Sequence, residues 1–163
     1  MTHRALVVIA GLGVLAGCGG RPIPELADAP DDVVILSIDG RPRHEAEEPP
    51  PEAAKVETVH GYPVLGRVAI GDPGQRREVV ERVRQAIRDG PGQPARCFIP
   101  RHVVRVAKGG SVTDVVVCFE CLRYRVYRDG QDEPGTGRTI ASDAQPYFDK
   151  LLTDAAVPLA PRE

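Results

Sequence analysis

The sequence predicts an α+β fold in which a small antiparallel sheet of about four strands packs with two helices, in the order β-β-α-β-β-α. Short runs of β-branched residues alternate with turn residues, and two segments place apolar residues at helical spacing. Aromatic residues are scarce, with three Phe, four Tyr and no Trp. The core is therefore expected to consist of Val, Ile, Leu and Ala.

The first half of the domain is predicted to contain two strands and one helix. Residues 33–38 and 64–70 are β-branched runs that end at glycine-containing turns. The helix begins after Asp72, which is placed as the N-cap, with Pro73 at the first helical position and Gln75 three residues after the cap. The apolar face of this helix consists of Val79, Val80, Val83, Ala86 and Ile87.

The second half is predicted to contain a hairpin and a final helix. Residues 102–106 form a strand, residues 108–111 a turn and residues 112–120 the returning strand. The extended chain continues through residues 122–127, where apolar and basic residues alternate as in a half-buried strand. A helix then begins near residue 142 or 143. Its apolar stripe consists of Phe148, Leu151, Leu152 and Ala155.

The N-terminus, residues 1–17, is predicted to be a targeting segment. An apolar run over residues 5–15 is shorter than the roughly 20 residues that a transmembrane helix needs, and such a run is typical of a signal peptide. The next residues, Leu15-Ala16-Gly17-Cys18, resemble the lipobox of bacterial lipoproteins. The resemblance implies cleavage before Cys18 and acylation of its thiol. Gly19 is similar to the residue that follows the cysteine in lipoproteins sorted to the outer membrane.

These features predict an exported protein that is anchored in the lipid bilayer of the bacterial cell envelope by acylated Cys18. The predicted location is the periplasmic face of the outer membrane rather than the inner membrane. Residues 18–32 are expected to be the lipidated cysteine and a tether, and residues 33–161 a single domain. Within the domain, the acidic and proline-rich residues 41–55 are expected to form a disordered loop. The formal charge of −2 provides no basic surface for nucleic acid, so no nucleic-acid partner is expected.

Three cysteines remain once Cys18 carries lipid: Cys97, Cys118 and Cys121. Residues i and i+3 of an extended strand point to opposite faces, so Cys118 and Cys121 can pair only if a bulge or turn separates them. One interpretation is therefore a disulfide from Cys97 to Cys118 or Cys121, which joins the loop after the helix to the hairpin. Such a bond stabilises the fold by about 3 kcal/mol in the chain-entropy estimate.

A second interpretation is a metal site. Three thiolates and one imidazole are the ligand set of a structural zinc site, and thiolate-rich ligands also suit Cu(I). The turn glycines expected beside zinc thiolates are absent from the sequence here. The four candidate ligands are Cys97, His102, Cys118 and Cys121.

A third interpretation is a redox or nucleophilic cysteine. Thiol activation requires a nearby cation, which Arg101 and His102 would provide, and Glu120 is close in sequence. The Cys-x-x-Cys pair lies on a predicted strand, however, and not at the helix start where thioredoxin-like oxidoreductases carry it. The residues leave the three interpretations open.

Two cysteine-containing segments, Cys97–His102 and Val117–Cys121, resemble segments in a group of small uncharacterised bacterial lipoproteins and secreted proteins. The segments His60–Gly66 and Val157–Pro161 are similar to parts of the same group, so the resemblance covers residues 33–161. It implies a single shared domain, and it implies no activity, cofactor or catalytic residue.

Motifs for common catalytic sites are absent from the sequence, which contains no P-loop, no GxGxxG after a strand, no GxSxG and no HExxH. No catalytic residue, cofactor or enzymatic activity is therefore predicted. The sequence favours a membrane-anchored binding or structural module of the cell envelope. The alternative is a thiol-dependent or metal-dependent envelope protein, with zinc or copper, that uses the cysteine and histidine cluster.

Overall fold

The computed structural model describes residues 26, 28–42, 56–93, 95–135 and 138–162. Within them lies one seven-stranded antiparallel sheet with two α-helices and a short 3-10 helix. The predicted signal peptide, the lipidation site, most of the tether and most of the acidic proline-rich loop lie outside the described residues.

The strands pair in the order β2-β3-β1-β4-β5-β6-β7, so that β4 lies at the centre of the sheet with β1 and β5 beside it. The strands in chain order are β1 (Asp32–Ile38), β2 (Thr58–Val59), β3 (Tyr62–Ala69), β4 (His102–Lys108), β5 (Ser111–Cys118), β6 (Arg123–Arg128) and β7 (Gln131–Asp132). The helices are α1 (Pro73–Arg88), η3 (Ser142–Ala144) and α2 (Gln145–Asp154).

The predicted α+β class is confirmed, but the predicted number and order of strands are wrong. Two of the additional strands, β2 and β7, contain two residues each, too few to show a periodic pattern. The third arises because residues 119–122 form a turn, where the extended chain was expected to continue. Leu122 adopts a left-handed conformation (φ 53°), and the chain reverses there so that β6 pairs antiparallel with β5.

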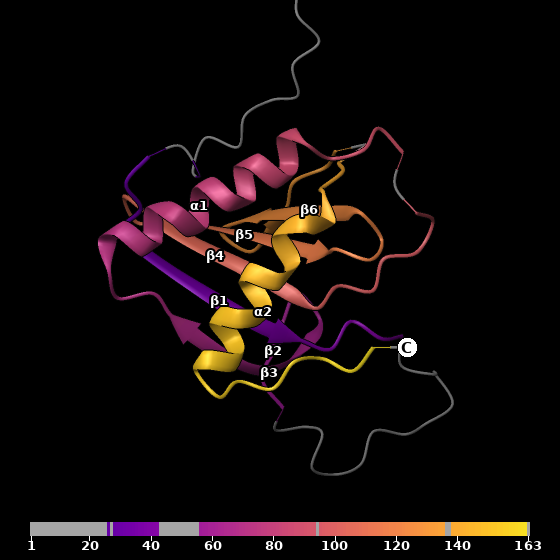
Figure 1. Ribbon diagram of the computed structural model, residues 1–163, viewed down its shortest axis with the longest axis horizontal. Coiled ribbons are helices and arrows are strands. Elements are labelled where there is room, and N and C mark those ends of the chain that lie inside the picture. Colours follow the sequence, from indigo (N-terminus) through magenta and orange to yellow (C-terminus); the bar gives the residue numbers. More distant parts are fainter. Residues whose placement is uncertain (1–25, 27, 43–55, 94, 136–137, 163) are drawn as a thin grey trace, which may run out of the picture.

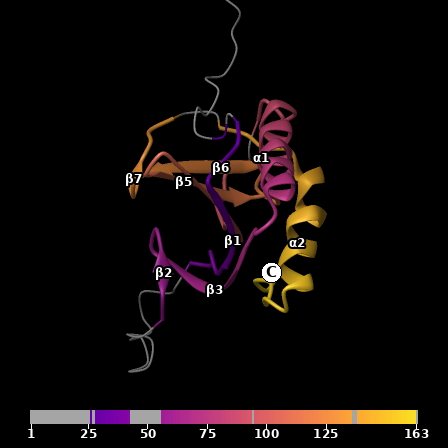
Figure 2. The same cartoon turned by 90° about the vertical axis from the view of Figure 1, so that its left-hand side faces the viewer.

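Both helices cover the same face of the sheet (Figures 1 and 2). α1 begins as predicted, because the Asp72 carboxylate accepts a hydrogen bond of 2.7 Å from the backbone N–H of Gln75. The helices pack their apolar residues on valines of β4 and β5 and on Val33 and Ile35 of β1 to form the main core. Phe148 of α2 is fully buried in this core, whereas Ala155, predicted on the same stripe, is the exposed C-cap of α2.

The sheet curls toward the face that the helices leave free. His60, in the turn between β2 and β3, stacks on Tyr127 of β6 with ring centroids 3.6 Å apart. Because β1, β4 and β5 separate β3 from β6 in the sheet, this contact requires strong curvature. A second, smaller core fills the concave side of the curl. Its buried members are Leu36, Ile38, Val59, Val103 and Val116.

Candidate functional site

The candidate site is a cluster of three sulfur atoms at the end of the β5 strand. Cys118 and Cys121 form a disulfide across the turn that residues 119–122 make after β5. The prediction had required a turn or bulge for this pairing and had placed the bond on Cys97 instead. The turn is present, with the backbone N–H of Leu122 bonded to the carbonyl of Phe119 at 3.2 Å, and it brings both Cys side chains to one side.

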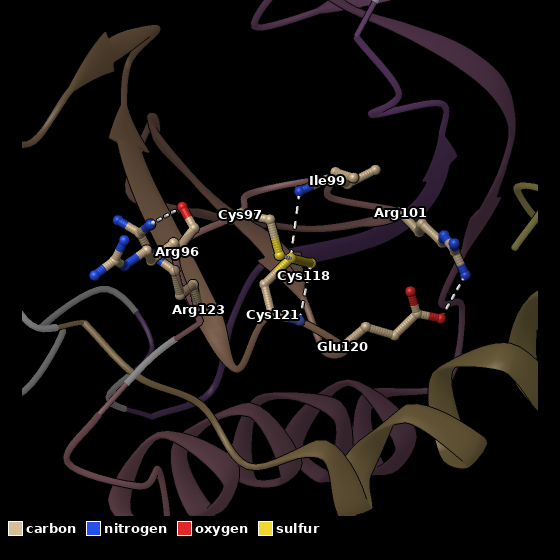
Figure 3. The surroundings of a disulfide bond; sticks show 8 residues. All are labelled: Arg96, Cys97, Ile99, Arg101, Cys118, Glu120, Cys121 and Arg123. Atoms are coloured by element: carbon tan, nitrogen blue, oxygen red, sulfur yellow. Dashed lines mark hydrogen bonds and ion pairs between the residues drawn. A yellow bond between two sulfur atoms is a disulfide. The ribbon is translucent and has the colours of Figure 1, made fainter. Parts of the chain in front are cut away.

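The third sulfur belongs to Cys97, which remains a free thiol in this structure. Its Sγ lies 3.3 Å from the Sγ of Cys121, so the structure brings the three cysteines together (Figure 3). The disulfide interpretation of the sequence had instead paired Cys97 with Cys118 or Cys121. Cys118 and Cys121 are 3% and 2% exposed, whereas Cys97 is exposed. Within the cluster, Cys97 is therefore the sulfur that a solvent-borne molecule can reach.

The segment that carries Cys97 is held against the turn by main-chain contacts. The backbone N–H of Ala95 donates to the carbonyl of Cys121 at 3.0 Å, and the backbone N–H of Ile99 lies 3.4 Å from the Cys121 Sγ. Gly40 packs behind the segment, where a Cβ would lie 2.2 Å from the carbonyl oxygen of Pro100. Hydrogen bonds on both sides of Cys97 and this close backbone approach fix the position of its thiol relative to Cys121.

A small pocket adjoins the Cys118 end of the disulfide. Its lining includes Cys118, Arg101, His102 and Glu120. The Arg101 side chain is 8% exposed and donates from Nη1 to Glu120 at 2.6 Å, while its Nε has no hydrogen-bond partner among the described residues. Arg101 and Cys118 thus line the same pocket, and the Arg101 guanidinium is turned toward Glu120 (Figure 3).

His102 is hydrogen-bonded to helix α2. It is 3% exposed, and its Nε2 lies 2.8 Å from the Oδ1 of Asp149. Burial raises the pKa of Asp149, but the hydrogen bond from His102 and the charge of Arg162 outweigh it and leave that pKa below its usual value. In the part of the chain that the structure describes, no group of three or more His, Cys, Asp or Glu residues is placed to hold a metal ion.

Sequence reasoning missed a second polar cluster, on the concave face of the sheet. Asp114 of β5 is buried and accepts two hydrogen bonds of 2.8 Å from Arg105 of β4. The Asp114 Oδ2 also lies 2.7 Å from the Nε2 of His60. His60 and Gly61 both have positive φ, 50° and 83°, as in the two-residue turns that join hairpin strands. This turn carries the imidazole across the curl to Asp114.

The sequence did contain a signal for half of this cluster. A turn that pairs Lys108 with Ser111 places Arg105 directly opposite Asp114, and this is the register that the structure has. The charged Asp114 within an apolar strand therefore already had an identifiable partner. His60 had no such signal, because its contact depends on the curvature of the whole sheet.

Comparisons of the chain with protein families, with curated proteins and with solved structures give no match. The resemblance to small uncharacterised lipoproteins therefore stays a prediction. Among the described residues, no helix has the length and apolar character needed to cross a membrane.

Proposed function

We propose that the protein is an exported lipoprotein, anchored to the cell envelope by acylated Cys18, whose domain carries out thiol–disulfide exchange. The observation that carries the proposal is the distance of 3.3 Å between the Cys97 thiol and the Cys121 sulfur of a disulfide. Reacting atoms that an enzyme holds in a near-attack arrangement are about 3–3.5 Å apart. The exposed thiol is thus placed to react with the buried bond.

The internal step is an exchange that needs no outside reagent. The deprotonated thiol of Cys97 attacks the Cys121 Sγ, a Cys97–Cys121 bond forms, and the Cys118–Cys121 bond breaks with its electron pair on the Cys118 Sγ. Cys118 then takes up the proton that Cys97 gave up. The backbone N–H of Cys121, 3.2 Å from the Cys118 Sγ, favours the anionic sulfur that leaves. The step moves the disulfide from a buried pair to the exposed Cys97.

The external step exchanges this disulfide with a dithiol. One thiolate of the dithiol attacks the exposed Cys97 Sγ. This attack forms a mixed disulfide between Cys97 and the dithiol and releases Cys121 as a thiolate. The second thiolate attacks the sulfur of the dithiol in that mixed disulfide and releases Cys97. The protein gains two electrons and two protons, and the dithiol becomes a disulfide. The reverse sequence allows the reduced protein to reduce an outside disulfide.

A purely stabilising role for the sulfur atoms has less support, because the observed pairing is the weaker constraint. The Cys118–Cys121 bond spans a sequence separation of 3 residues, whereas a Cys97–Cys121 bond would span 24. In the chain-entropy estimate these bonds contribute about 1.5 and about 3.5 kcal/mol. The arrangement leaves the stronger constraint unmade and an exposed thiol beside a disulfide.

The proposal predicts how the fully reduced full-length protein, in detergent, reacts with one equivalent of the neutral disulfide 2,2′-dithiodipyridine. We expect release of two equivalents of pyridinethione, because Cys97 takes the first sulfur group and Cys121 displaces it. Cys97→Ser should slow the release at least about tenfold, because the buried sulfurs are then the remaining reactants. Absorbance of the released thione provides the measurement.

Two further variants distinguish the roles of the buried cysteines. Cys121→Ser should release one equivalent and retain a mixed disulfide on Cys97, since the attacking sulfur nearest to Cys97 is gone. Cys118→Ser is the matched control, because it also removes a buried sulfur but should still release two equivalents. Equal rates for the original protein and Cys97→Ser would contradict the proposal.

A further inference from the structure

We infer that the exchange site is built for an anionic substrate, a disulfide or thiol compound that carries carboxylates near its sulfur atoms. The inference rests on the proposed exchange function and adds the chemical class of the substrate. It follows from three arginines beside the exposed Cys97: Arg96, Arg123 and Arg125.

Two of these arginines are fixed on one face of β6. Arg123 and Arg125 are two residues apart on the strand, so their side chains project from the same face. Both guanidinium groups lie against the ring of Phe98, which follows Cys97 in the chain. Their Cζ atoms are 5.9 and 4.7 Å from the ring centroid. Cation–π contact with this ring therefore places two positive charges next to the residue that carries the thiol.

The third arginine precedes Cys97 directly. The exposed Arg96 accepts, at its main-chain carbonyl, a hydrogen bond of 3.4 Å from the Nη1 of Arg123. Figure 3 shows the Arg96 and Arg123 side chains on one side of the sulfur cluster, with Arg101 and Glu120 on the other. The charges around the thiol are thus contributed by both chain segments that form the site.

Within the described residues, these three arginines have no carboxylate partner, unlike the other basic residues near the site. Arg101 pairs with Glu120, and Arg105 pairs with Asp114. Among the described residues, no salt bridge joins Arg96, Arg123 or Arg125 to an acidic side chain. Asp132 on β7 and Arg125 both lie near Tyr62. The negative charge of Asp132 therefore offsets part of the positive charge of the three arginines.

A carboxylate on the substrate would complete this arrangement. Guanidinium groups bind carboxylates through two parallel hydrogen bonds, and a local excess of positive charge raises the rate at which anions arrive. The site is wide open at Cys97, so recognition has to come from groups around the thiol and not from an enclosing cavity. Among the described residues, charge is therefore the property by which the site can distinguish one substrate from another.

The test compares three disulfide probes on the reduced, full-length protein in detergent. They are 5,5′-dithiobis(2-nitrobenzoate), which carries two carboxylates, neutral 2,2′-dithiodipyridine and cationic cystamine. The variant replaces Arg96, Arg123 and Arg125 with Gln together, and Arg77→Gln on the exposed face of α1 is the matched control. We expect the triple variant to react about tenfold more slowly with the anionic probe and within about twofold of the original protein with the neutral one. Added salt should slow the reaction of the anionic probe with the original protein but not with the triple variant.

The outcomes separate this inference from the function on which it rests. If the triple variant loses rate equally with all three probes, or loses none with the anionic probe, the anionic-substrate inference is overturned and the exchange function stands. If the original protein does not react with the neutral probe through Cys97, the exchange function itself fails. Faster reaction of the triple variant with cystamine, together with slower reaction with the anionic probe, would support selection by charge.

Discussion

Replacing Asp114 with Ala is expected to lower the free energy of unfolding by about 3 kcal/mol. The Asp114 side chain is 5% exposed and accepts hydrogen bonds from Arg105 and His60. Its removal leaves a guanidinium and an imidazole on the concave face without the carboxylate that satisfies them. For a domain of this size the melting temperature should fall by roughly 10 °C. Thermal and urea unfolding followed by circular dichroism measure both values.

A surface ion pair supplies the control for this experiment. Asp154 bonds Lys150 within α2, and their side chains are 61% and 72% exposed. Asp154→Ala should change the free energy of unfolding by less than about 0.5 kcal/mol, because exposed pairs contribute little. Similar losses for the two variants would show that the Asp114 cluster does not hold the curl of the sheet together.

Replacing Cys18 with Ser is expected to abolish membrane attachment. The serine hydroxyl is no substrate for the thiol alkylation that the lipobox resemblance implies, so the chain would lack its acyl chains. A stable anchor needs more than one acyl chain or a second membrane signal, and none of the described helices can span a bilayer. The full-length gene product, expressed in a lipoprotein-exporting bacterium, is followed by fractionation and by incorporation of labelled fatty acid.

Cys97→Ser is the matched control for the anchor, because it also removes one thiol but lies in the domain. It should remain in the membrane fraction and keep its fatty-acid label. If Cys18→Ser also stays in the membrane fraction and is labelled, the lipoprotein assignment is wrong.

The elements with strong local patterns were predicted correctly from the sequence. Helix α1 follows its pattern because the Asp72 cap and the Pro73 start are local, and its apolar face repeats over several turns. The hairpin of β4 and β5 follows for the same reason, because its turn sets the register between the strands. The short β2 and β7 strands exist because neighbouring strands offer them hydrogen bonds, and such pairing has no signature within two residues.

The candidate site was predicted in part. The sequence singled out the three domain cysteines as the candidate site, and the structure brings their sulfur atoms together. Their pairing could not be deduced, because it depends on a turn in which Leu122 has a positive φ, an uncommon conformation for leucine. The contact of His60 with Asp114 also could not be deduced, since it joins residues 54 positions apart through the curvature of the sheet.

The central claim is tested most directly by the masses of two tryptic peptides. The unreduced protein is first alkylated at acidic pH to stop exchange and is then digested. Cleavage at arginine and lysine places Cys97 in the peptide of residues 97–101, and both Cys118 and Cys121 in the peptide of residues 109–123. We expect an alkylated 97–101 peptide and an unalkylated 109–123 peptide that is lighter by two hydrogen atoms. A single mass that joins the two peptides throughout the sample would instead show a fixed bond to Cys97, and it would contradict the exchange site.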